Sequence, residues 1–456
     1  MYTTLSIDNP SNLVFGRAPH PVTTRRGLVI GGGVVYPELN FTMPPTKITL
    51  GTLPALRTEY ASIVRGALER ALALESPGVI FEFETLIEMT QEPKIGVELT
   101  AAMNEVCEEY FQRHGLKSEI RLTPNDIRDF ERPPRQRTSA LLEKMLQLFD
   151  EGAKAGGDLL SIESTGGKEV CDDGLMMCNF REVIFALSVL GVRDMKMLWE
   201  KIVAIARSNG KIPGGDTACG FGNTAMVLAE KGYIPKVAAA VVRVATAPRT
   251  LVACEMGALG PDKDCGYEGP FLKAIAGIPI SMEGKTSACA HSSPLGNIAA
   301  ACADLWSNES VQNIKLLAGM APTVYMEQLE YDARLMNQAI GKGDASVRTL
   351  QGLFVDSDCW HDPQALILAP ENVIAISKEL INGTTYIERT VNGCLKALDI
   401  IETAVNEKRL KMPDSEAGWI ERLREEISTI PGDESAFVEE MLPQLEGKFI
   451  PSEYGL

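Results

Sequence analysis

The chain has 456 residues, of which 45% are hydrophobic and 23% are charged, so it is long enough to bury a large core. Its formal net charge is −17 at pH 7, which argues against a nucleic-acid partner, because such binding depends on clustered Lys and Arg. The start, MYTTLSIDNPSNLVFG, lacks the basic and then apolar pattern of a secretory signal. The apolar run from Val237 is interrupted by Arg243, short of the roughly 18 residues that a membrane helix needs. We therefore expect a cytoplasmic protein that does not bind membranes, with its ten cysteines reduced.

Residues 1–50 are rich in Pro, Gly and β-branched residues, which predicts an irregular N-terminal extension with a hairpin. The triplet Gly31-Gly32-Gly33 lacks the spacing of both phosphate-binding glycine motifs. We interpret it as a structural turn.

Strand and helix patterns alternate between residues 51 and 331. The predicted strands cover residues 79–84, 118–122, 159–162, a short segment at 212, and 276–282. The predicted helices begin near residue 53 and then cover about 95–114, 138–153, 180–190, 196–208, 225–231 and 236–247. Such alternation is typical of an α/β protein with a parallel sheet, and over this length it favours a β/α (TIM-type) barrel, although the pattern does not resolve eight strands.

After about Asp332 the pattern becomes almost wholly helical, with the clearest helices at residues 373–381, 385–406 and 416–428. The predicted organisation is therefore an N-terminal extension (1–50), a barrel that carries the functional site (51–331), and a helical remainder with a C-terminal extension (332–456). The last part either completes the core or builds a subunit interface.

Three chemically reactive side chains lie in glycine-rich loops after predicted strands. Glu163 follows the strand at 159–162, Cys219 lies in GGDTACG, and Cys265 lies in PDKDCGYEG. In parallel α/β proteins, ligands bind at the carboxyl ends of the strands. A catalytic zinc site takes three protein ligands and leaves a fourth position open, so one carboxylate and two thiolates fit such a site. We predict that Glu163, Cys219 and Cys265 are the metal-binding and catalytic residues.

Other cysteines and histidines provide rival interpretations. Cysteine is often simply a small buried residue. Six cysteines fall in helical patterns and are interpreted as core residues: Cys107, Cys171, Cys178, Cys254, Cys302 and Cys394. The first alternative ligands are the C-x-H pairs Cys289 with His291 and Cys359 with His361, because zinc sites so often use histidine.

Two further kinds of catalytic site receive less support. None of the four histidines lies beside a G-x-S-x-G motif, so nothing indicates a Ser or Cys hydrolase. The carboxylates Glu82, Glu84 and Glu88 could line a pocket, but acidic runs usually form solvated faces.

The sequence resembles the methanol:corrinoid methyltransferases, the zinc subunits of the methanol-utilising systems of methanogenic archaea and acetogenic bacteria. The resemblance runs along essentially the whole chain and is carried by the stretches LVFG, IGGGVVYPELNF, IESTGGKE, IPGGDTACGFGNTAMVLA and GPDKDCGYEGP. It implies a β/α barrel with an N-terminal extension and added helices, whose zinc is held by one Glu and two Cys. These ligands fall on Glu163, Cys219 and Cys265, with Cys254 or Cys289 as the fallback for the last.

The resemblance also implies the reaction, in which methanol transfers its methyl group to the Co(I) of a corrinoid. Zinc would act as a Lewis acid on the methanol oxygen, but two thiolates and a carboxylate give the site a formal charge of −1, which weakens that effect. We therefore expect a nearby hydrogen-bond or proton donor. The candidates are Asp216, Lys263, Tyr267 and Glu84.

The cobalamin-binding signature D-x-H-x-x-G is absent from the sequence, so the corrinoid is expected on a separate corrinoid protein. The resemblance further implies that this chain dimerises within a complex with that protein. Two alternatives of other classes remain: a zinc-dependent barrel hydrolase and a non-catalytic scaffold subunit. A methyltransferase for another small methyl donor is also possible.

Overall fold

Seven parallel strands form one curled sheet in the computed structural model of the protein, which describes residues 1–42, 47–263, 265–285, 293–311, 315–317 and 319–456. The strands are β3 (Tyr36–Thr42), β4 (Val79–Glu84), β5 (Ser118–Thr123), β6 (Gly157–Ile162), β7 (Ile212–Asp216), β8 (Ser281–Glu283) and β9 (Leu305–Val311). Their order in the sheet is β7-β6-β5-β4-β3-β9-β8, and each neighbouring pair is parallel.

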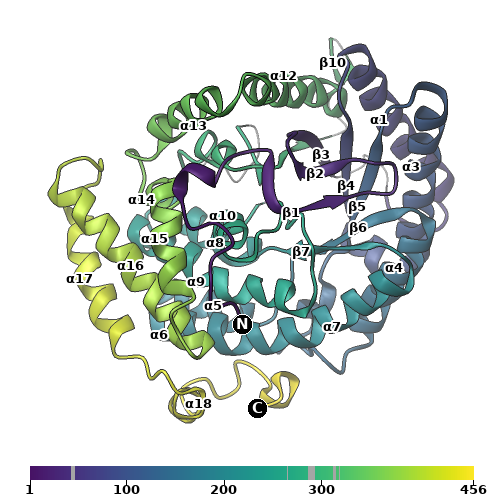
Figure 1. Cartoon of the computed structure of the whole chain (residues 1–456). Helices are drawn as coiled ribbons and strands as arrows, with labels where there is room; N and C mark the ends of the chain where they lie inside the picture. The colour runs from purple at the N-terminus through teal and green to yellow at the C-terminus, as the bar shows by residue number, and fades with distance from the viewer. Residues whose placement is uncertain (43–46, 264, 286–292, 312–314, 318) are drawn as a thin grey trace.

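An irregular segment, residues 259–262, joins the two edge strands of this sheet. The amides of Leu259 and Gly260 donate to the carbonyl oxygens of Pro213 and Gly214 in β7, at 2.8 and 2.9 Å. On the other side, the amide of Asp262 donates to the carbonyl oxygen of Pro279, just before β8, at 3.3 Å. Helices surround the sheet, as Figure 1 shows. The arrangement is compatible with a TIM-type barrel in which this segment occupies the position of one strand.

The helices that pack around the sheet form from amphipathic runs with ordinary caps. For example, α4 buries Leu142, Met145 and Phe149 on one face, and the Ser139 side chain accepts a hydrogen bond from the amide of Leu141 at its start. The helices between β3 and β8 are α1 (Leu53–Ala73), α2 (Ile87–Gln91), α3 (Pro93–His114), α4 (Ala140–Ala155), α5 (Lys168–Met176), α6 (Phe180–Phe185), α7 (Val192–Ser208), α8 (Cys219–Glu230), α9 (Lys236–Met256) and α10 (Gly269–Ala276).

Beyond β9 the described chain is mostly helical, as the sequence predicted. A two-stranded hairpin, β10 (Lys315–Leu316) with β11 (Gly319–Met320), comes first. The helices that follow are α12 (Ala321–Gly341), α13 (Asp344–Asp358), α14 (Pro363–Leu366), α15 (Pro370–Leu380), α16 (Tyr386–Asn406), α17 (Asp414–Ser428) and α18 (Glu434–Met441).

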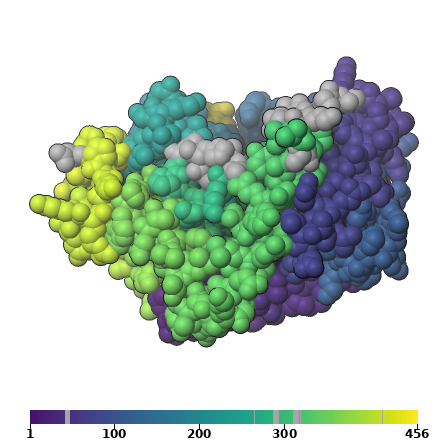
Figure 2. All heavy atoms as spheres, turned by 90° about the horizontal axis from the view of Figure 1, so that it is seen from above, coloured from purple at the N-terminus to yellow at the C-terminus, as the bar shows by residue number. Residues whose placement is uncertain are grey.

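A small apolar cluster closes one end of the sheet's interior. Its members come from four strands and from the N-terminal hairpin β1 (Arg17–Thr23) and β2 (Val29–Gly32). The fully or largely buried residues of this cluster are Leu28, Ile30, Tyr36, Ile80, Leu159 and Leu305. The hairpin lies across the sheet in Figure 1, and Figure 2 shows the N-terminal segment along one edge of the molecule.

Farther along the strands the interior becomes charged. Arg121 of β5 donates to Glu38 of β3 at 2.6 Å and to Ser161 of β6 at 3.1 Å, so the side chains of non-adjacent strands meet across the concave face. Arg121 also donates to the carbonyl oxygens of Pro261 and Asp262, at 3.0 and 2.8 Å. This single guanidinium therefore fastens the irregular segment to the sheet.

Helix α9 is long and apolar enough to cross a membrane by length and composition, but its whole apolar stretch is buried inside the protein, as in a core helix. It continues through Arg243, where the sequence showed an interruption, and it contacts α7, α8 and α16. Both of its central arginines, Arg243 and Arg249, are fully buried.

The structure corrects three details of the predicted organisation. The strand Tyr36–Thr42 lies between β4 and β9, so the sheet begins within residues 1–50; Pro37 had weakened the strand pattern there. Helix α12 crosses the predicted boundary at residue 331. Cys178 lies beyond the end of α5 with a φ of 50°, so it does not share a helical face with Cys171. The division into three parts otherwise stays a prediction.

Candidate metal centre

The three predicted metal ligands lie at one end of the sheet, although they come from separate loops. Glu163 directly follows β6, Cys219 is the first residue of α8 after β7, and Cys265 follows the irregular segment 259–262. Their ligand atoms all lie within 4.8 Å of one another, and the Cys265 Sγ is 3.2 Å from the Glu163 Oε1. The structure thus brings together one carboxylate and two thiols, a donor set that suits zinc.

The cluster is sheltered but remains open on one side. Cys265 is buried, whereas Cys219 is half-buried and the Glu163 side chain is 26% exposed. A closed structural zinc site has four protein ligands, while a catalytic one keeps a position for water or substrate. Three donors with partial exposure fit the second kind.

The chain turns sharply after Glu163, and a glycine makes the turn possible. Gly167 has a φ of +87°, and a Cβ atom placed on it would lie 2.7 Å from the carbonyl oxygen of Ala186. Any side chain at this position would be strained and would clash with the backbone, so Gly167 is required where α5 begins.

Residue Ser164, next to Glu163, is held on both sides. Its hydroxyl donates to the Asp216 Oδ2 at 2.7 Å, and its carbonyl oxygen accepts from the Arg249 Nη2 at 2.7 Å. Trp199 also donates to Asp216, at 2.8 Å. Because all of these groups are buried, the backbone that carries Glu163 has little freedom to move.

The two loops that carry the cysteines are hydrogen-bonded to each other. The amide of Ala218 donates to the Glu268 Oε1 at 2.6 Å, and the amide of Gly266 donates to the Thr217 Oγ1 at 2.9 Å. Helix α9 holds the second of these loops as well, since the Arg243 Nη1 donates to the carbonyl oxygen of Gly266 at 2.9 Å. Ala218 beside Cys219 and Gly266 beside Cys265 are therefore both fixed by hydrogen bonds.

A buried lysine, Lys263, lies against the candidate ligand Glu163. The Lys263 Nζ is 3.0 Å from the Glu163 Oε1, 3.2 Å from the Glu82 Oε1 and 3.7 Å from the Glu84 Oε2. Its side chain is 1% exposed. One positive charge therefore sits among three carboxylates at the end of the sheet.

A cavity of about 260 Å³ opens beside Glu163. Its wall comes from the loops after β4, β5, β6 and β7, and it includes Glu84, Thr123, Asp126, Asp129, Phe130, Glu163, Ser164, Lys168 and Gly220. Burial, and then the neighbouring Asp126 carboxylate, raise the pKa of Asp129. The wall thus holds four carboxyl groups and one lysine, and the cavity reaches the candidate ligand Glu163 directly.

The four candidate donors fall in different places. Asp216 is fully buried behind the Glu163 loop, where burial raises its pKa to about 6. The hydroxyl of Tyr267, also buried, donates to the carbonyl oxygen of Glu283 at 3.2 Å. Lys263 and Glu84 lie beside Glu163, and Glu84 lines the cavity with it.

The rival ligands do not join this cluster among the residues that the structure describes. Cys254 is buried in α9, where burial raises the pKa of its thiol. Cys359 lies at the end of α13, and burial raises its pKa to about 11. Cys289 and His291 lie outside the described residues.

Sequence reasoning missed several residues that support the centre. Glu82 is fully buried beside Lys263, so the solvated-face interpretation was wrong for it, while Glu88 is exposed as expected. The Asn223 Nδ2 donates to the Cys219 Sγ at 3.0 Å, and no local pattern indicated this contact. One sequence feature could have indicated such supporting residues: Arg243 and Arg249 interrupt the otherwise apolar run that forms α9.

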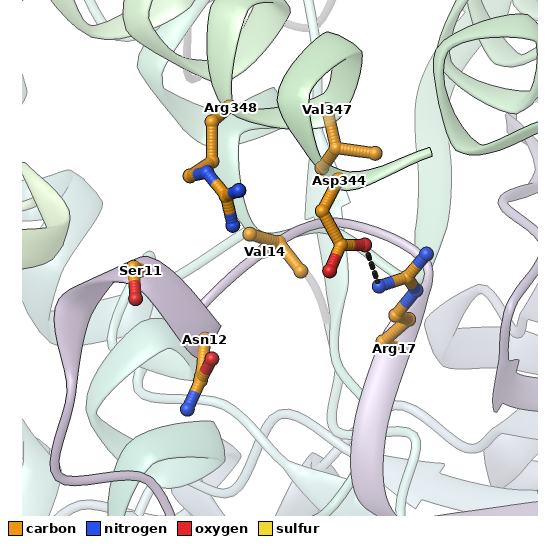
Figure 3. A pocket seen from close by; sticks show the side chains of 7 residues that line it. All are labelled: Ser11, Asn12, Val14, Arg17, Asp344, Val347 and Arg348. Carbon is orange, nitrogen blue, oxygen red and sulfur yellow. Dashed lines mark hydrogen bonds and ion pairs between the residues drawn. The ribbon is translucent and has the colours of Figure 1, made fainter. Parts of the chain in front are cut away.

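Another cavity, of about 180 Å³, lies between the N-terminal segment and the start of α13. Figure 3 shows its lining side chains, in which Arg17 pairs with Asp344 at 2.6 Å. It is lined by Ser11, Asn12, Val14, Arg17, Asp344, Val347 and Arg348, none of which is a predicted site residue.

A curled parallel sheet with a carboxylate and two thiols at the ends of its strands defines an α/β protein with a candidate catalytic metal centre. The family model described as "Methanol-cobalamin methyltransferase B subunit" matches residues 1–455. The chain belongs to this family, and the resemblance inferred from the sequence is confirmed. The chain is therefore a methanol:corrinoid methyltransferase by family, as the sequence predicted.

Two relatives from Methanosarcina barkeri match over nearly their whole length. The methanol–corrinoid protein co-methyltransferase of strain Fusaro / DSM 804 is 35% identical over 463 residues, which cover 100% of this chain and 99% of that protein. The crystal structure of the methanol:cobalamin methyltransferase complex MtaBC contains a chain with 34% identity and a TM-score of 0.95, covering 100% of this chain and 99% of that one.

Proposed function

We propose that this protein is a zinc-dependent methyltransferase that transfers the methyl group of methanol to the Co(I) of a corrinoid carried by a separate protein. The convergence of Glu163, Cys219 and Cys265 at the end of the sheet carries the proposal. Membership of the methanol-cobalamin methyltransferase B subunit family, and the names of the two Methanosarcina barkeri relatives, support the choice of substrate and acceptor.

The reaction has a simple balance. Co(I) supplies the electron pair of the new carbon–cobalt bond and becomes Co(III), while the carbon–oxygen bond of methanol breaks and its electron pair stays on oxygen. One proton taken up at that oxygen gives water, so methanol, Co(I) and a proton yield methyl-Co(III) corrinoid and water. Hydroxide is a poor leaving group, so the enzyme must withdraw charge from the oxygen.

The residues present fit a zinc ion. Glu163, Cys219 and Cys265 would hold it through one carboxylate oxygen and two sulfur atoms, which leaves one position free in a tetrahedral set. Zinc bound there would act as a Lewis acid toward the methanol oxygen.

The protein itself would position the alcohol and admit the second reactant. Glu84 faces the cavity together with Glu163, so a bound alcohol would meet this carboxyl group and could be oriented by it. A volume of about 260 Å³ exceeds what one methanol molecule fills, because a water molecule occupies about 30 Å³. The corrinoid is far larger than this cavity, so it would stay at the mouth and present its cobalt in line with the carbon–oxygen bond.

The acceptor must come from another chain, because this sequence lacks the D-x-H-x-x-G cobalamin signature. A corrinoid protein docked at the mouth of the cavity is therefore part of the proposal. The homodimer within a larger complex and the cytoplasmic location stay predictions.

The test combines zinc content with a methylation assay. The purified protein is assayed for zinc and for conversion of cob(I)alamin to methylcobalamin with methanol as the methyl donor. The variants are Glu163→Gln, Cys219→Ala and Cys265→Ala, with Glu143→Gln on exposed α4 surface and Cys178→Ala outside the site as matched controls. We expect near-stoichiometric zinc and methylation in the wild type and in both controls, and loss of both in the three site variants.

Each other outcome has a defined meaning. Zinc that binds without methylation would reject methanol transfer and direct attention to another methyl donor or to hydrolysis. Absence of zinc from a folded protein that has been supplied with the metal would reject the metal centre itself.

A further inference from the structure

Lys263 connects the carboxylate ligand to the interior of the sheet. Its Nζ lies 3.0 Å from the Glu163 Oε1 and 3.2 Å from the Glu82 Oε1. Glu82 is fixed in turn, because its Oε1 accepts a hydrogen bond from the Thr123 hydroxyl at 2.9 Å. Lys263 and Glu82 are almost completely buried, so the position of Glu163 is set by a chain of contacts that begins in β4 and β5.

Asn223 makes a comparable contact with one of the thiol ligands. It lies one helical turn after Cys219 in α8, and its Nδ2 is 3.0 Å from the Cys219 Sγ. An amide that donates to a sulfur atom stabilises the thiolate form and lowers the charge that the sulfur gives to a metal. This contact is therefore directed at the ligand atom itself.

These two contacts would reduce the negative charge that the donor set places on a bound zinc ion. Zinc with one carboxylate and two thiolates has a formal charge of −1, and a metal in such a set is a weaker Lewis acid. The Lys263 ammonium lies 3.0 Å from a candidate ligand oxygen and 3.2 Å from the buried Glu82 carboxylate, so it offsets part of the negative charge around Glu163 in a setting where charges are poorly screened. The neutral Asn223 amide, which donates a hydrogen bond to the Cys219 Sγ, would lower the electron density that this sulfur gives to the metal, without adding a charge of its own.

We propose that Lys263 and Asn223 are positioning residues of the metal centre: Lys263 orients Glu163 and offsets the negative charge of the donor set, and Asn223 holds Cys219 and moderates its donation to the metal. This inference rests on the proposed function, since it concerns the same site. Neither residue needs to touch methanol to act in this way.

The first test measures zinc affinity. The variants are Lys263→Met, Lys263→Arg and Asn223→Ala, and the matched controls are Lys154→Met on the exposed side of α4 and Asn382→Ala in an exposed turn. Competition with a chromophoric chelator should give a zinc affinity about 10–100-fold weaker for Lys263→Met and Asn223→Ala, as for other groups that support metal ligands. Lys263→Arg should retain most of the affinity, and the controls should match the wild type.

The second test uses the protein with Co²⁺ in place of zinc, whose sulfur-to-metal charge-transfer band reports the thiolate directly. Loss of a hydrogen bond raises the energy of the sulfur electrons, so Asn223→Ala should move this band to longer wavelength. Lys263→Met should leave the band nearly in place, because Lys263 contacts the carboxylate ligand. A purely structural role for Asn223 would not produce a shift in a folded variant.

The outcomes separate this inference from the proposed function. Unchanged zinc affinity in Lys263→Met and Asn223→Ala, with an unshifted Co²⁺ band, would overturn the inference even if the wild type methylates cobalamin. Weakened affinity and a shifted band would support it even if methanol proves not to be the donor. If Lys263→Met does not fold, Lys263→Gln takes its place with the same expected loss of zinc affinity, and the Asn223→Ala measurements decide the Asn223 part independently.

Discussion

Arg249 of α9 donates from Nη2 to the carbonyl oxygen of Ser164 and to its hydroxyl oxygen, each at 2.7 Å, across 85 positions of the chain. Ser164 is the residue next to Glu163, so this guanidinium fixes the loop of the candidate carboxylate ligand. Arg243, two turns earlier in α9, fixes Gly266 beside Cys265 in the same way. One buried helix therefore supports two of the three ligand loops.

Replacing Arg249 should weaken both the fold and the metal site. Arg249→Met leaves Asp216 buried without its guanidinium, and breaking a buried pair in this way costs about 3–5 kcal/mol. Denaturant unfolding should show a decrease of this size, and zinc affinity should fall because Ser164 loses its donor. The double variant Arg249→Met/Asp216→Asn should recover part of the stability. A single variant with wild-type stability and zinc affinity would contradict this role of α9.

The stability of the protein should depend on the protonation of Glu169. The hydroxyl of Tyr454 donates to its Oε1 at 2.7 Å, and burial raises its pKa from an ordinary 4.5 to about 7. The folded state therefore favours the protonated carboxyl, so its contribution to stability is full below pH 4.5 and is lost as the pH rises through about 7. The difference is on the order of 3 kcal/mol.

Urea unfolding of the wild type and of Glu169→Gln at several pH values between about 4.5 and 7 checks this, at equal zinc saturation. The difference between the two proteins should change across this range, whereas Glu143→Gln, on exposed surface, should follow the wild type. A constant difference between wild type and Glu169→Gln would show that Glu169 does not titrate in the fold.

The hairpin at the closed end of the sheet should matter for stability alone. Leu28 is fully buried in the small apolar cluster, so Leu28→Ala should lower the free energy of unfolding by about 2–5 kcal/mol. The metal ligands lie at the other end of the strands, so zinc content and methylation per folded molecule should not change. The control is Val29→Ala, since Val29 is 37% exposed and should tolerate the change. Loss of zinc in folded Leu28→Ala would mean that the two ends are coupled.

Removal of zinc should lower the melting temperature without unfolding the chain. The main hydrophobic core extends through most of the helices and strands, so secondary structure does not depend on the metal as it does in a zinc finger. Zinc at 100 times its dissociation constant should add about 2.7 kcal/mol of stability. Far-UV circular dichroism of the chelator-treated protein should match that of the loaded one, and Cys219→Ala should lose the zinc-dependent rise in melting temperature.

Much of the centre was predictable because the local pattern and the position in the fold agree. The run at 159–162 that ends in Glu163 is a strand, and its glycine-rich loop lies at the carboxyl end of a parallel sheet. The loop with Cys219 follows β7 and obeys the same rule, whereas Cys265 follows the irregular segment 259–262, which lies between β7 and β8 where a strand would be expected.

The supporting contacts could not be predicted in this way, because they depend on sheet register and on how helices pack. Lys263 meets Glu82 only because the irregular segment 259–262 closes against β7 and β8, and that segment has no strand pattern. The strand Tyr36–Thr42 was missed because Pro37 removes a backbone donor that a central strand normally supplies.

The arrangement of the ligands also sets an order of events during biosynthesis. Glu163 and Cys265 are separated by 102 positions, and they meet only when β6, β7 and residues 259–262 have assembled. A nascent chain that ends before Cys265 offers at most two of the three donors. Under the proposed function, the ion is therefore loaded late, into a nearly finished protein, and zinc added to folded, metal-free enzyme should activate it without new synthesis.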